Sequence, residues 1–168
     1  MADDATRMLM YLMQQAFDGA RDDDAEHQAL LPNLQSVNPD DWQARPAGTE
    51  RSIRDIVLHV GACKYMYADH MFGSGRLDWT SPIVDPWPSS EPHMREVIEW
   101  MEAGHRKLMR HVEELDAAAM TALRSAPWGE PRETRWLLSV LLQHDLYHAG
   151  EVNHLRSVRH DDRWAFLK

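Results

Sequence analysis

The sequence predicts an all-α protein, and specifically a bundle of four helices. No stretch alternates apolar and polar residues over several positions, as a half-buried strand would. Apolar residues instead recur every three or four positions in four separate segments, which is the spacing of an amphipathic helix. Clusters of proline and glycine separate these segments. Because neither an internal repeat nor a shift in composition divides the chain, residues 1–168 are expected to form a single domain.

The first helix is expected to begin near Asp4 and to bury one apolar stripe. The stripe consists of Met8, Leu9, Leu12, Met13 and Ala16. The pattern weakens at the acidic run of residues 22–24 and resumes over about residues 25–37. Pro32 lies inside this continuation, so a kink or a new helix start is expected there.

The second helix is expected to begin at Ser52 and to end near Phe72. Ser52 with Asp55 three residues later resembles a capping box, with aspartate in place of the usual glutamate. The apolar stripe of this helix is Ile53, Ile56, Val57, Val60 and Cys63. Glycines within residues 73–75 end it. Residues 76–90 combine several prolines with two tryptophans and are expected to form a long, ordered loop.

The third and fourth helices follow after this loop. The third is expected to start near Ser89 or Ser90, with Pro92 in its first turn. Its stripe has alternating spacings of four and three residues, as helix–helix packing requires: Met101, His105, Leu108, Val112 and Leu115. The fourth helix is expected from about Thr134 to about Val158, after a turn rich in proline and glycine.

The fourth helix carries two histidines where its stripe should be apolar. His144 and His148 are four residues apart, so they lie about 40° apart on one helical face, and Glu151 shares that face. Burying two imidazoles and a carboxylate without partners would cost several kcal/mol. A divalent metal ion removes that cost, and zinc, nickel and iron all accept imidazole nitrogen. The pair therefore predicts a metal site.

A third ligand is expected from another helix at the same level of the bundle. His59 is the best candidate, because it lies in the most apolar stretch of the second helix and shares a face with Ile56 and Cys63. The alternative is a buried histidine bonded to a backbone carbonyl or to a side chain of the third helix. Three histidines would leave coordination positions open, which is characteristic of catalytic metal sites.

Three further residues of the fourth helix are candidate catalytic groups. Glu151 and Asp145 are candidates for a base or for a partner of a ligand histidine, and Tyr147 is a candidate donor to substrate. Solvent exposure is an equally good interpretation for Asp145. Cys63 is interpreted as a small core residue rather than as a nucleophile.

Composition and charge exclude several classes of protein. The net charge of −9 argues against a nucleic-acid partner, because few cations would displace counterions from phosphate. A single cysteine excludes an internal disulfide and fits a reducing compartment. The chain shows neither a signal-peptide-like start nor an apolar run long enough to span a membrane, so a soluble cytoplasmic protein without a membrane partner is expected.

Two segments carry a resemblance to a known family. RSIRDIVLHV at residues 51–60 and HDLYHAGEV at residues 144–152 resemble two helices of the DinB-like proteins, which are also grouped with bacillithiol- and mycothiol-dependent transferases. The resemblance covers most of the chain. It implies an up-down four-helix bundle, frequent homodimers, and a metal site whose ligands map onto His59, His144 and His148. The family's arginine after the last ligand is Ala149 here, and its glutamine is Glu151.

The resemblance implies a metal-dependent enzyme that acts on a small molecule, as a thiol-dependent transferase or as a hydrolase. A low-molecular-weight thiol would then be a second cofactor. Pocket residues are expected on the first two helices, with His27, Lys64 and Tyr67 as candidates that no motif marks. One alternative is a stress protein that binds metal or a small ligand without catalysis.

A second alternative is a di-iron carboxylate bundle. Glu102 with His105, and Glu151 with His154, both fit the Glu-x-x-His motif that such bundles use twice. That fold also requires a glutamate from each of the other two helices, and the expected second helix contains none.

Overall fold

The protein is described by a computed structural model that covers residues 4–19, 28–46, 48–78 and 93–160. Four long helices dominate these residues: α1 (Asp4–Asp18), α4 (Ile53–Phe72), α5 (Met94–Glu113) and α7 (Thr134–His160). The shorter elements are α2 (Leu30–Gln35), α3 (Pro39–Trp42), α6 (Ala117–Thr121), and the antiparallel pair β1 (Leu123–Arg124) and β2 (Arg132–Glu133). The prediction of an all-α protein is confirmed.

The start of α4 follows from its sequence. The Ser52 hydroxyl accepts the Asp55 N–H at 3.2 Å, and the Asp55 carboxylate accepts the Ser52 N–H at 2.9 Å. This is the predicted capping box, and it satisfies two backbone donors at the helix end. The helix ends at Phe72, as expected, and the Gly73 N–H bonds to the Asp69 carbonyl. His59 is thereby fixed in the second turn of a well-anchored helix.

Two other helices have boundaries that differ from those predicted. The expected helix over residues 25–37 is the shorter α2, in which Pro32 lies in the first turn, where a missing N–H leaves no helical bond unmade. Helix α5 begins at Met94, and the Glu96 carboxylate accepts the N–H of the preceding His93. The helix start that we expected near residues 89–90 lies outside the described residues. So does most of the loop that we expected at residues 76–90.

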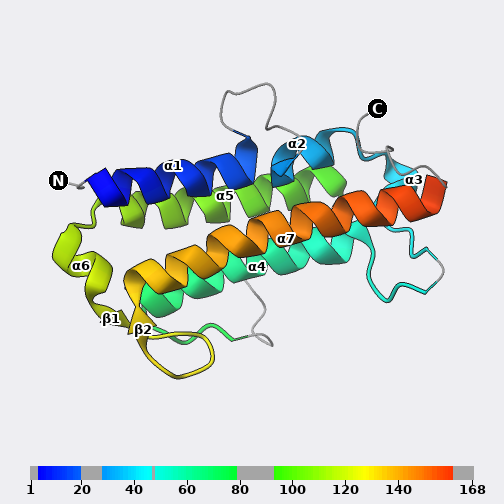
Figure 1. The fold of residues 1–168 in the computed structure, drawn as a ribbon. Helices are drawn as coiled ribbons and strands as arrows, with labels where there is room; N and C mark the ends of the chain where they lie inside the picture. Colours follow the sequence, from blue (N-terminus) through cyan, green and yellow to red (C-terminus); the bar gives the residue numbers. More distant parts are fainter. Residues whose placement is uncertain (1–3, 20–27, 47, 79–92, 161–168) are drawn as a thin grey trace.

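Helices α4 and α5 run parallel to each other. Their contacting pairs advance together along both helices: Gly61 with Trp100, Tyr65 with Gly104, and Phe72 with His111. In Figure 1, α1 and α7 run in one direction and α4 and α5 in the other. An up-down bundle requires each helix to run opposite to the one before it. That part of the prediction is wrong for α4 and α5, which run in the same direction. The chain between Phe72 and Met94 is long enough to return past a helix of about 30 Å.

The core consists of two apolar clusters, one at each end of the bundle. The first includes Ile56, Val60, Trp100, Val152 and Leu155, and the second includes Met66, Leu108, Val112, Leu137 and Leu141. The buried polar residues Lys64, His105, Asp145 and His148 lie between them. The middle of the bundle is thus a polar layer between two apolar halves. Along the described chain, no helix combines the length and apolarity needed to cross a membrane.

Candidate metal centre

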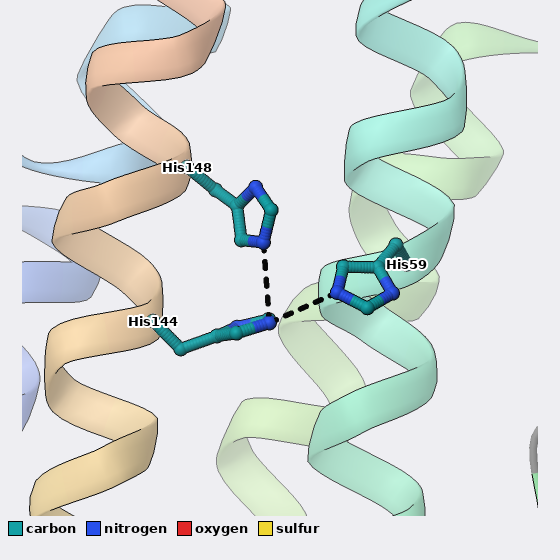
Figure 2. Close-up of side chains that lie close together, drawn as sticks. All are labelled: His59, His144 and His148. Atoms are coloured by element: carbon teal, nitrogen blue, oxygen red, sulfur yellow. Dashed lines mark hydrogen bonds between the residues drawn. The ribbon is translucent and has the colours of Figure 1, made fainter. Parts of the chain in front are cut away.

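The structure brings together the three histidines that the sequence singled out. The Nε2 atom of His144 lies 3.0 Å from Nε2 of His59 and 3.2 Å from Nε2 of His148. Figure 2 shows the three rings converging, with His59 on α4 and the other two on α7. These helices are antiparallel neighbours, so a residue near the start of α4 meets residues in the middle of α7.

The spacing of these nitrogens fits one metal ion. Two nitrogens that each lie about 2.1 Å from a metal are about 3.4 Å apart at a tetrahedral angle and about 3.0 Å apart at a right angle. The two measured separations lie in this interval. Each of these three residues offers one ligand atom, and the three atoms lie close enough together to share an ion. No other such group is found among the described residues. Three protein ligands leave room for a further ligand.

His148 is oriented by a carboxylate. Its Nδ1 donates to the Glu151 carboxylate at 2.7 Å, and the His148 side chain is only 3% exposed. A histidine that donates through Nδ1 presents the lone pair of Nε2, which is the form that binds metal. Nδ1 of His144, in contrast, is buried and has no hydrogen-bond partner among the described residues.

All three imidazoles are held neutral. Burial lowers the pKa of His59 to about 4 and that of His144 to about 3, with repulsion from neighbouring histidines adding to the effect. Burial also lowers the pKa of His148, against the opposing influence of Glu151. Neutral imidazoles have free lone pairs at neutral pH, so the site requires no deprotonation before it can accept a cation.

Cys63 lies closer to the site than the sequence suggested. Its sulfur is 3.8 Å from Nε2 of His59 and 3.7 Å from Nε2 of His144. The side chain is buried, as expected of a core residue, and burial raises the pKa of the thiol to about 12. The thiol is therefore protonated and forms part of the wall of the site. The position of Cys63 one turn after His59, on the same helical face, is the sequence signal of this proximity.

The candidate catalytic residues of α7 have different surroundings. Glu151 is half-buried and bonded to His148, whereas Tyr147 is 70% exposed, with its ring edge-on to His148. Asp145 is fully buried, so its interpretation as a solvent-exposed residue is wrong. It accepts a hydrogen bond from the Lys64 ammonium at 2.5 Å. The sequence did not predict this ion pair, because its members are far apart in the chain and each looks like an ordinary surface charge.

Two of the three candidate pocket residues, Lys64 and Tyr67, lie in the described part of the chain. Lys64 is fully buried against Asp145. Tyr67 is buried in the second apolar cluster, with its ring edge-on to Trp128. His27 lies outside the described residues.

The residues of the di-iron alternative also lie apart. Glu102 pairs with Arg106 on the surface of α5, and His105 is buried in a stack on Phe17. His154 is exposed on α7. The two Glu-x-x-His motifs therefore supply no common site among the described residues.

Comparison with known proteins agrees with this geometry. Residues 23–152 match the DinB superfamily, and this range includes all three histidines of the site. A separate comparison with curated proteins finds no match to the sequence. Because the family match covers most of the chain and includes α4 and the part of α7 that carries the cluster, this protein belongs to the DinB superfamily.

Proposed function

We propose that this protein is a metal-dependent enzyme that acts on a small molecule, as a thiol-dependent transferase or as a hydrolase. His59, His144 and His148 would hold one zinc, nickel or iron ion. The observation that carries the proposal is the convergence of their three Nε2 atoms from two helices. Neutral imidazoles and an ordered Nδ1 donor support it.

A bound ion with open coordination positions supplies Lewis acidity, which lowers the pKa of a water or thiol ligand. The residues around the site have separate tasks. Glu151 keeps the proton of His148 on Nδ1, so that Nε2 faces the ion. The partly exposed rings of His59 and His144 leave the site accessible to a small molecule, and the exposed Tyr147 hydroxyl can donate to it. The homodimer that the family resemblance implies stays part of the proposal.

Elemental analysis of the purified protein tests the metal site. The wild type is expected to contain about one ion per chain, whereas His59→Ala and His148→Ala should lose most of it, because two imidazoles bind far more weakly than three. His154→Ala is the matched control, since it removes an exposed imidazole from α7 outside the cluster. Unchanged metal content in both site variants would show that the site is wrong.

Activity assays then distinguish catalysis from simple binding. The metal-loaded protein is incubated with low-molecular-weight thiols and an electrophile, and separately with ester and amide substrates. Turnover that depends on the ion and is lost in His148→Ala supports an enzyme. Stoichiometric metal without turnover on any of these substrates favours the non-enzymatic alternative.

A further inference from the structure

A buried ion pair joins the same two helices that carry the histidines. Lys64 on α4 and Asp145 on α7 have side chains that are 0% and 1% exposed, and their charged atoms are 2.5 Å apart. Asp145 directly follows His144, and Lys64 directly follows Cys63, whose sulfur contacts His59 and His144. The ion pair is therefore adjacent to the histidine cluster on both helices.

Lys64 also contacts the other two long helices. Its ammonium lies 5.3 Å from the centre of the Phe17 ring on α1. On α5, a Cβ added at Gly104 would lie 3.2 Å from the Lys64 Cβ, which shows how closely the two backbones approach. A single side chain thus connects all four helices in the polar layer of the bundle.

Stability does not explain this pair. Transferring two charges from water into a protein interior has a desolvation cost that often exceeds their attraction. The second carboxylate oxygen of Asp145, Oδ1, is buried and has no hydrogen-bond partner among the described residues, which adds to that cost. Apolar residues of similar size would fill the space between the two apolar clusters at no such cost. A buried pair of this kind has value where it selects one alignment of two helices over others.

His144 is the ligand that needs such an alignment. His148 has Glu151 to orient its ring, but Nδ1 of His144 has no corresponding partner in the described structure. The direction of the His144 ring therefore depends on the position of its backbone on α7. Asp145 fixes that backbone relative to α4 through Lys64.

We propose that Lys64 and Asp145 are positioning residues of the metal centre. Their ion pair sets the register of α4 against α7 and thereby places His144 between His59 and His148. This inference rests on the proposed metal site, and it adds that the affinity of the site depends on two charges that do not touch the ion.

The test replaces both charges together, because a single substitution would leave the other charge buried and alone. Lys64→Met with Asp145→Leu keeps side chains of similar volume, so the double variant should fold and unfold cooperatively. Its affinity for zinc should fall about 10- to 100-fold, the range found when groups that orient metal ligands are removed. Competition with a chromophoric chelator measures the affinity, and the visible spectrum of the cobalt(II)-loaded protein reports the ligand geometry, which should change.

Arg156→Met is the control for general destabilisation. Arg156 is buried on α7 and donates to the carbonyls of Asn33 and Ser36, so its loss should lower stability. It lies away from the cluster, and zinc affinity and the cobalt spectrum should stay at wild-type values. A decrease in zinc affinity equal to that of the double variant would overturn the inference, because weak binding would then follow from instability alone.

Asp145→Asn is a second variant, which removes the negative charge and leaves the Lys64 ammonium with a neutral acceptor. It keeps the size of the side chain and an oxygen that can accept from Lys64, and its zinc affinity should lie between those of the wild type and the double variant. Wild-type affinity and an unchanged cobalt spectrum in either variant would overturn the positioning role while leaving the metal site intact. A wild type that binds no zinc, cobalt, nickel or iron would overturn both proposals.

Discussion

At the scale of single residues, Glu151 marks where this chain differs from the family pattern. A carboxylate occupies a position where the resemblance led us to expect glutamine, and it accepts the Nδ1 proton of His148. A carboxylate partner increases the electron density on the imidazole and favours metal binding through Nε2.

Substitutions of Glu151 should separate the hydrogen bond from the charge. Glu151→Ala removes both and should weaken zinc binding about 10- to 100-fold. Glu151→Gln keeps an oxygen that can accept from Nδ1, so its zinc affinity should fall less than that of Glu151→Ala. Chelator competition measures both variants. Equal affinity of Glu151→Ala and the wild type would show that the contact does not orient the ligand.

The histidine cluster could be predicted because each of its members interrupts an apolar stripe. His144 and His148 stand out on α7, and His59 stands out in the most apolar part of α4. Lys64 and Asp145 also lie at stripe spacing, four residues after Val60 and Leu141. A charged residue on an amphipathic helix is nevertheless usually at the surface, and nothing in the spacing pairs the two. Their burial depends on contacts 81 residues apart, which periodicity cannot show.

At the scale of helices, the close contact of α4 and α5 depends on glycine. A Cβ at Gly61 would lie 2.1 Å from the Trp100 ring, and one at Gly104 would lie 2.7 Å from the Tyr65 ring. Both glycines are buried, and both face aromatic side chains of the opposite helix. The parallel pair can therefore lie closer together than larger residues would allow.

Gly61→Ala should lower the free energy of unfolding by about 1–3 kcal/mol, because Trp100 must shift to admit the methyl group. Gly150→Ala is the matched control on α7, since nothing lies within 4 Å of the added Cβ. It should raise the free energy of unfolding by about 0.4–1 kcal/mol, because alanine favours the helix. Urea unfolding compares the two. A Gly61→Ala protein as stable as the wild type would contradict the packing.

The helices themselves were largely predictable, whereas their directions were not. The capping box fixed the start of α4, and glycine fixed its end, because both act through neighbouring residues. Apolar periodicity shows which face of a helix is buried but not which way its neighbour runs. The parallel contact of α4 and α5 therefore appears only in the structure.

At the scale of the whole molecule, buried neutral histidines should make the metal-free protein sensitive to acid. Burial lowers the pKa of His105 to about 2, whereas an unfolded histidine has a pKa of about 6.5. Below about pH 6.5 the unfolded chain binds a proton that the folded protein excludes, so stability falls as pH falls. His59 and His144 act in the same direction, but their partial exposure weakens the effect.

His105→Phe isolates this contribution, because phenylalanine can keep the stack on Phe17 without titrating. Between pH 7.5 and pH 5, the wild type should lose about 2 kcal/mol more unfolding free energy than the variant. The comparison cancels the opposite effect of Asp145, whose pKa is raised by burial. Urea unfolding of metal-free protein at the two pH values measures it, and equal losses would show that His105 does not exclude the proton.

The separation of the three histidines along the chain has a consequence for folding. His144 and His148 are neighbours on one helix, whereas His59 is 85 residues from His144. If the cluster binds an ion as proposed, a refolding chain can hold it with two nitrogens as soon as this part of α7 is helical. The third nitrogen arrives only when α4 docks, after the intervening chain has been closed into a loop at an entropic cost. In the proposed site, full affinity for the ion thus develops only after α4 has docked on α7, and tight metal uptake would report that this contact has formed.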